Sequence, residues 1–149
     1  MNKQSTRVIR TVASIVLSLW IAGPRALAQS PPEVTAANAA GWQIPASAAE
    51  EKNPLSPTPA VLKKGRELFV GNCQMCHGPA GKGDGPYGDP KHPPADLTAA
   101  EISDGILFYK VWNGRKDPLM PAFKTIITKD EVWTVVTYAR TLHKPSGAH

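Results

Sequence analysis

The five residues from 73 to 77 constrain this chain more than any other part of its sequence. They read Cys-Gln-Met-Cys-His and contain both of the cysteines found among the 149 residues. On a helix, Cys73 and Cys76 lie about one turn apart on the same face. His77 adds an imidazole directly beside them. The fold must therefore present two thiols and an imidazole from one short segment.

This segment carries the groups that covalent haem attachment requires. The two thiols can add to the two vinyl groups of haem, and the imidazole of His77 can bind the iron. A thioredoxin-like dithiol would need a βαβ context, a zinc site would need a second ligand pair, and a disulfide would leave His77 unexplained. We therefore predict one covalently bound haem c per chain, attached through Cys73 and Cys76 with His77 as an axial ligand.

The first 28 residues have the three zones of a secretory signal peptide. A basic start is followed by an apolar run over residues 11–23 and by an Ala-Leu-Ala triplet that ends at Ala28. Because crossing a membrane needs about 20 apolar residues, an uncleaved anchor is the weaker alternative. We expect cleavage near Ala28, a periplasmic or otherwise exported product, and no stable membrane span after cleavage.

Removal of this leader changes the charge balance of the chain. It takes away four of the 17 basic residues and none of the 12 acidic ones, which leaves 13 against 12. A nearly neutral mature chain gives no support for nucleic-acid binding.

The mature chain divides into three parts by composition. Residues 29–57 are rich in Ala and Pro and read as an N-terminal arm without sustained apolar periodicity. Trp42 either packs this arm onto the folded body or stays exposed, and the sequence does not decide between the two. Residues 58–144 form the predicted haem domain, and residues 145–149 form a short tail.

Three helices are predicted in the haem domain, and no strands. The first starts at Thr58-Pro59 and leads into Cys73, because a hydroxyl cap followed by proline is typical of a helix start. The second starts near Ser103 and ends at Asn113-Gly114. The third follows a capping box at Thr128–Glu131. We therefore expect an all-α fold with three main helices and two long loops.

The second axial ligand must come from another part of the chain, and a thioether is favoured in electron-transfer cytochromes. Met1 leaves with the signal peptide, and Met75 lies between the two attached cysteines, where it cannot reach the opposite haem face. Met120, between Pro118 and Pro121, is the remaining methionine. A gap-filling core role for Met120 is the alternative.

The histidines outside the motif are weaker candidates. His92 is a possible alternative ligand, although its flanks of Lys91 and Pro93 suit a solvated loop residue. His143 and His149 are interpreted as surface residues without a function.

The predicted ligand set decides the chemistry. An iron with six permanent ligands has no open position for a substrate, so such a site carries electrons and does no bond chemistry. A five-coordinate haem enzyme or sensor is the alternative if Met120 does not bind.

From about Pro54 to Lys144 the chain resembles the class I c-type cytochromes, in particular the bacterial haem domains related to oxidase-associated cytochromes. The resemblance rests on the following motifs: Gly65-x-x-x-Phe69, Cys73-x-x-Cys76-His77-Gly78, Gly81–Gly85, Met120-Pro121 and the helix from Trp133 to Leu142.

This resemblance implies a cytochrome c-like fold wrapped around one haem. It implies that the first and last helices cross at Gly65, where Phe69 meets Tyr138 or Trp133. It also implies that the second ring nitrogen of His77 bonds to a backbone carbonyl of Pro93 or Pro94.

We therefore predict a periplasmic monohaem cytochrome that passes single electrons between a donor and an acceptor protein, such as a terminal oxidase or a dehydrogenase. The alternative is a fixed haem subunit of a larger exported oxidoreductase, with residues 29–57 as the contact to the catalytic partner. In either case the chain itself is not expected to be an enzyme.

Overall fold

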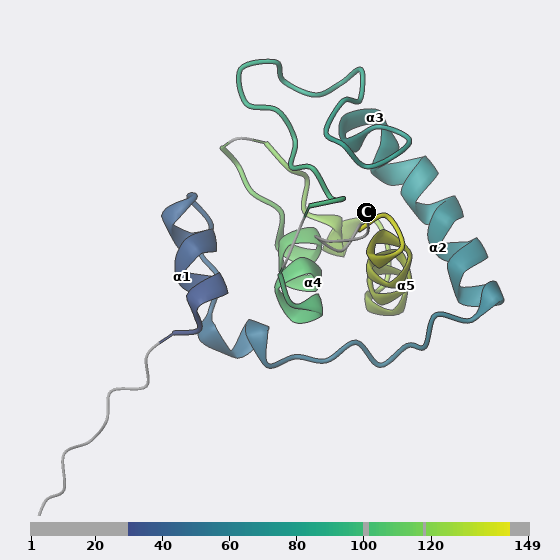
Figure 1. Cartoon of the computed structure of the whole chain (residues 1–149), viewed down its shortest axis with the longest axis horizontal. Coiled ribbons are helices and arrows are strands. Elements are labelled where there is room, and N and C mark those ends of the chain that lie inside the picture. The colour runs from purple at the N-terminus through teal and green to yellow at the C-terminus, as the bar shows by residue number, and fades with distance from the viewer. Residues whose placement is uncertain (1–29, 100–101, 118, 144–149) are drawn as a thin grey trace, which may run out of the picture.

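A computed structural model describes residues 30–99, 102–117 and 119–143 (Figure 1). The predicted leader, residues 1–28, and the predicted tail, residues 145–149, lie outside them. The described part is helical, with two isolated β-bridges and no strand, and none of its helices is long and apolar enough to span a membrane. The elements in chain order are α1 (Pro32–Ala39), η1 (Ala46–Ala49), α2 (Pro59–Asn72), α3 (Gln74–His77), α4 (Asp104–Asn113), η2 (Phe123–Thr125) and α5 (Lys129–Arg140).

The three predicted helices are present as α2, α4 and α5, and their caps are the predicted ones. The Thr58 hydroxyl accepts from the backbone N–H of the third residue of α2 at 3.3 Å, and the Ser103 hydroxyl does the same for α4 at 3.4 Å. At the start of α5, Thr128 and Glu131 form the complete capping box. Each cap satisfies N–H groups that a helix start otherwise leaves without partners.

Helices α2 and α5 cross in close contact at Gly65. A Cβ atom at Gly65 would lie 2.6 Å from the carbonyl oxygen of Thr134 and 2.6 Å from Cβ of Tyr138. One turn further on, the rings of Phe69 and Tyr138 meet with their centroids 5.5 Å apart. The expected contact with Tyr138 is therefore confirmed. Trp133 lies elsewhere and stacks on Phe108 of α4.

The stack of Phe108 and Trp133 joins α4 to α5, with the ring centroids 4.2 Å apart. These rings belong to a buried cluster between the two helices and η2, which also includes Leu107, Val111, Phe123, Val132, Val136 and Ala139. Helix α5 therefore packs against α2 on one side and α4 on another, and it links the two halves of the molecule.

The segment from residue 30 to 57 is more ordered than its composition suggests. It forms α1 and η1, which lie beside α4, and then runs past α4 and α5 to reach α2 (Figure 1). Its buried side chains pack on Ile106 of α4, and Trp42 and Tyr109 pack against the same cluster. Of the two roles left open for Trp42, the structure shows the packed one.

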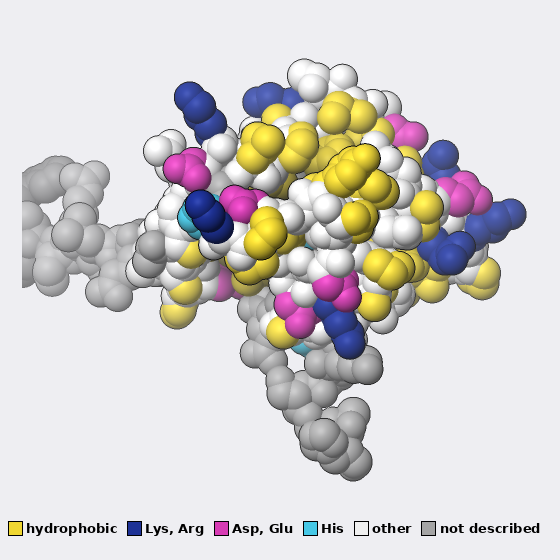
Figure 2. Space-filling view, turned by 90° about the horizontal axis from the view of Figure 1, so that it is seen from above, with side chains coloured by type: hydrophobic (Ala, Val, Ile, Leu, Met, Phe, Trp, Pro, Cys, Tyr) yellow, Lys and Arg dark blue, Asp and Glu magenta, His cyan; other side chains and the backbone are white. Residues whose placement is uncertain are grey.

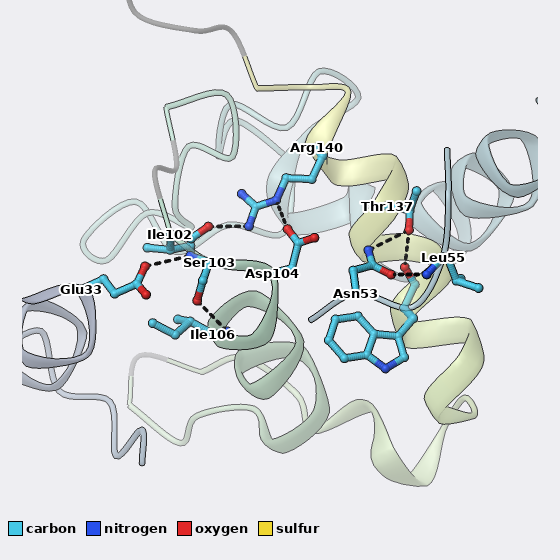
Figure 3. Close-up of polar contacts among 10 residues, drawn as sticks. Glu33, Asn53, Leu55, Ile102, Ser103, Asp104, Ile106, Thr137 and Arg140 are labelled. Carbon is cyan, nitrogen blue, oxygen red and sulfur yellow. Dashed lines mark hydrogen bonds and ion pairs between the residues drawn. The ribbon is translucent and has the colours of Figure 1, made fainter. Parts of the chain in front are cut away.

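Two polar contacts hold this segment to the later helices (Figure 3). The Glu33 carboxylate accepts a hydrogen bond from the backbone N–H of Ser103 at 2.9 Å. In a capping box that N–H would be bonded by a carboxylate three residues further on, but Ile106 occupies that position. The amide of Asn53 donates to the Thr137 hydroxyl of α5 at 2.9 Å. Glu33 therefore completes the cap of α4 from a distant part of the chain.

We predict that Gly65→Ala destabilises the protein by about 1–3 kcal/mol, because the added methyl group overpacks the α2–α5 crossing. Chemical denaturation followed by circular dichroism measures the change. Gly71→Ala is the matched control on the same helix, since a Cβ there has nothing within 4 Å. It should leave stability unchanged or slightly raised. Equal effects of the two substitutions would contradict the close crossing.

Candidate functional site

Cys76 and His77 lie on α3, a single helical turn, and Cys73 lies between α2 and α3 as the residue that caps both. Cys73 ends α2 and begins α3, and its side chain packs against the buried cluster of Leu68, Phe69 and Val135. Cys73 and Cys76 are half-buried free thiols. The three predicted site residues of this segment therefore lie together at one helical turn.

The loop after His77 fixes α3 by hydrogen bonds to its backbone. A helix of four residues leaves all of its carbonyl groups without intrahelical partners. Here each carbonyl accepts an N–H from the residues that follow: Gln74 from Gly78 at 2.8 Å, Met75 from Tyr87 at 2.8 Å, Cys76 from Gly85 at 3.1 Å and His77 from Gly83 at 2.9 Å. The long loop therefore holds the motif in a defined orientation.

Glycines let this loop approach α3 closely. A Cβ at Gly85 would lie 2.5 Å from the carbonyl oxygen of Met75 and 2.6 Å from the carbonyl carbon of Cys76. Gly78 and Gly83 have φ angles of +78° and +79°, which other residues rarely adopt. The glycine-rich loop that follows His77 therefore wraps the motif.

The ring of His77 is oriented by a backbone carbonyl, as predicted, but the predicted acceptor was wrong. Its Nδ1 lies 3.1 Å from the carbonyl oxygen of Ala95, not of Pro93 or Pro94. The Pro94 carbonyl instead packs against Gly83, where a Cβ would lie 2.2 Å from it. Because a carbonyl can only accept, Nδ1 carries the proton and Nε2 keeps a lone pair for a metal.

Burial sets the protonation of these groups. It raises the pKa of the Cys73 thiol to about 12, and the neighbouring Cys76 contributes in the same direction. Burial also lowers the pKa of His77, while the hydrogen bond to Ala95 opposes this. Near neutral pH the site therefore holds a protonated Cys73 thiol and a neutral imidazole, and the neutral imidazole is the form that binds a metal.

Met120 lies in a separate part of the structure, on the loop between α4 and η2. Its backbone N–H and carbonyl both pair with Arg115, at 2.8 Å in each direction. Its half-buried side chain packs against the α4–α5 cluster. Gly114 lies directly beneath, since a Cβ there would be 2.4 Å from the Met120 carbonyl oxygen. The flanking Pro118 lies outside the described residues.

The other histidines behave differently from one another. His92 is exposed, and its Nδ1 lies 3.0 Å from the carboxylate of Asp89, as suits a solvated loop residue. His143 was predicted at the surface but is half-buried, and its Nδ1 has no hydrogen-bond partner among the described residues. His149 lies outside them.

Sequence reasoning missed the groups that act through their backbone. Ala95 offers a carbonyl, and Arg115 offers an N–H and a carbonyl. No side-chain pattern marks such roles, because every residue carries these groups. The Gly114 position was recognisable only as a helix stop.

Residues 60–138 match the family model described as cytochrome c oxidase, cbb3-type, subunit III. The match covers more than half of the chain and includes the motif at residues 73–77. This chain belongs to that family of class I c-type cytochromes. The all-α, cytochrome c-like fold agrees with this assignment.

This cytochrome is similar to parts of two longer proteins. FixP, a subunit of the cbb3-type cytochrome c oxidase of Azorhizobium caulinodans, is 32% identical over an alignment of 94 positions, and the match covers 57% of this chain and 28% of FixP. A chain of the reducing HAO-like protein complex of Kuenenia stuttgartiensis is similar in structure, with a TM-score of 0.51 and 28% identity. That likeness covers 61% of this chain and 47% of the other. The cytochrome thus spans less than half of either relative.

Members of this family bind haem c covalently, and the residues on α3 fit that group. Two free thiols on one turn suit two thioether bonds, and His77 has its Nδ1 bonded to Ala95 and its Nε2 left for iron. This cytochrome therefore binds one covalently attached haem c and is related to the electron-transfer haem subunits of oxidoreductase complexes.

We predict that Gly114→Ala destabilises the cytochrome more than Gly41→Ala. Both glycines have positive φ angles, +62° and +85°, so either substitution should cost about 1–3 kcal/mol in backbone strain. Only at Gly114 would the methyl group also collide with the Met120 backbone. Thermal unfolding of the two variants measures the difference, and equal losses would count against the close approach of the Met120 loop.

Proposed function

We propose that this cytochrome is a periplasmic electron carrier with one haem, held by Cys73 and Cys76 and ligated by His77 and Met120. The observation that carries the proposal is the geometry of α3, where two free thiols share one turn with a histidine whose Nδ1 is bonded to Ala95. Cys73 and Cys76 would hold the haem by adding their S–H groups across its two vinyl groups, which would form two thioether bonds without an oxidant.

Met120 is proposed as the second axial ligand. Its support is the elimination of the other methionines together with a loop that is tied down at Gly114 and Arg115. When bound, haem iron supplies a one-electron couple between its ferrous and ferric states. With both axial positions filled by His77 and Met120, the protein offers no position for a substrate and acts as a carrier.

Exposed apolar side chains, two of them beside the motif and one beside Met120, support docking to redox partner proteins. Met75 is 41% exposed, Tyr87 74% and Leu119 80%. Figure 2 looks onto the side that is uppermost in Figure 1, and hydrophobic side chains gather in the middle of this face, with most charged ones nearer its rim. Such a patch is typical of a protein contact. The partner would be an electron donor or acceptor such as a terminal oxidase or a dehydrogenase.

A second candidate function is a fixed haem subunit of a larger exported oxidoreductase. The observation that favours it is the likeness to FixP, a subunit of an oxidase. Purification without a tag separates the two functions: a free carrier elutes alone, whereas a subunit remains with a larger enzyme.

The ligand assignment is tested with Met120→Ala. We predict that the variant loses the weak far-red absorption band of ferric Met-ligated haem and that its ferrous form binds carbon monoxide rapidly, because the sixth position is open. His92→Ala is the control and should keep the parent spectrum. An unchanged spectrum in Met120→Ala would overturn the assignment. Rapid carbon monoxide binding by the parent would favour the five-coordinate enzyme or sensor.

The proposed export and attachment are tested by mass. We predict that the purified protein starts at Gln29 and that its intact mass equals residues 29–149 plus one haem. It should be recovered from the periplasmic fraction. Cys73→Ala should retain a single thioether, which shifts the absorption of the pyridine haemochrome. An intact leader, or haem that is lost on acid extraction of the parent, would contradict the proposal.

A further inference from the structure

The segment before the family match contacts the Met120 loop at Arg115. The matched region begins at residue 60, so the segment 30–53 is not part of it. The backbone of Arg115 pairs with Met120 in both directions at 2.8 Å. Its side chain points to the N-terminal segment. Arg115 therefore connects that segment to the proposed axial ligand.

The side chain of Arg115 contacts the N-terminal segment at Ala40 and at Trp42. Its Nη1 donates to the carbonyl oxygen of Ala40 at 2.8 Å. Its guanidinium carbon lies 4.6 Å from the ring centroid of Trp42, within the range of a cation–π interaction. The Ala40 carbonyl follows α1, where the helix dipole also favours a cation.

Trp42 and Ala40 are themselves held in a tight turn. The Trp42 N–H donates to the Ala37 carbonyl at 3.2 Å, and the Ala40 N–H donates to Ala36 and Ala37. The side chain of Asn38 bonds to both backbone groups of Ile44, at 3.0 and 2.7 Å. The buried cluster around Ile106 packs this tight turn against α4. It can therefore act as a rigid support.

We propose that Ala40, Trp42 and Arg115 form a clamp that positions Met120 against the haem iron. The inference rests on the proposed function, because it takes Met120 to be the ligand. A thioether is a neutral ligand. Its apparent affinity for iron therefore depends on the fraction of molecules in which the loop holds Met120 in the binding position. The clamp raises that fraction by holding Arg115, to which the Met120 backbone is bonded.

The test is the affinity of the ferric protein for imidazole, which must displace Met120 to bind. Trp42 makes cation–π contacts with Lys110 of α4, at 5.0 Å, and with Arg115. We expect Trp42→Ala in the full, haem-loaded protein to bind imidazole about tenfold more tightly, because the contact with Arg115 is lost and the Arg115 hydrogen bond to Ala40 is weakened. Its far-red band should weaken. Trp42→Phe keeps an aromatic face and should lie between the parent and Trp42→Ala.

Asn53→Ala is the matched control within the same segment. It removes the hydrogen bond to Thr137 of α5 and leaves the contacts of Arg115 with Ala40, Trp42 and Met120 in place. It should lower the unfolding midpoint and leave imidazole affinity unchanged. If Trp42→Ala fails to fold, Arg115→Lys decides, because it keeps the charge but loses the guanidinium geometry, and it should also raise imidazole affinity.

The outcomes separate the two proposals. If the parent lacks the far-red band and binds imidazole as tightly as Met120→Ala, the ligand assignment fails and the clamp fails with it. If the parent shows the band and its imidazole affinity equals that of the Trp42 and Arg115 variants, the clamp alone is overturned. An equal rise in affinity in Asn53→Ala would also overturn it, because general loosening would then explain the effect.

Discussion

The close crossing of α2 and α5 at Gly65 is the contact on which the arrangement of the site depends. Helix α3 continues directly from α2, so the position of α2 sets that of Cys73 and His77. Helix α5 is stacked on α4 through Phe108 and Trp133, and α4 ends where the Met120 loop begins. The two parts of the proposed ligand set are therefore placed relative to each other through α5.

The motif itself is held mainly by backbone hydrogen bonds. A loop of this length without regular structure is uncommon in a small domain and is usually functional. Here N–H groups of the loop donate hydrogen bonds to the carbonyl groups of α3, and the Ala95 carbonyl orients the ring of His77. The apolar core lies instead between the helices, in separate clusters. Apolar packing therefore stabilises the arrangement of the helices, and backbone hydrogen bonds stabilise the site.

Local signals explain why so much of the fold could be predicted. The caps at Thr58, Ser103 and Thr128 act within four residues of their partners, and Cys73–His77 is a contiguous motif. The missed features depend on distant backbone groups. Helix α1 has almost no amphipathic pattern, since it is rich in alanine, and it is stabilised by packing on α4. The Pro94 carbonyl packs against Gly83, and the Ala95 carbonyl bonds to His77 instead. Spacing along the sequence does not reveal this arrangement.

The bond between Glu33 and Ser103 joins residues that are 70 positions apart. The N-terminal segment is synthesised first, yet its partners on α4 emerge much later. Contacts of such long sequence separation form slowly, because the loop between them must be closed first. The α2–α5 crossing, where Gly65 and Phe69 meet Tyr138, joins residues about equally far apart. Docking of the N-terminal segment and closure of the α2–α5 crossing therefore carry similar costs in loop-closure entropy.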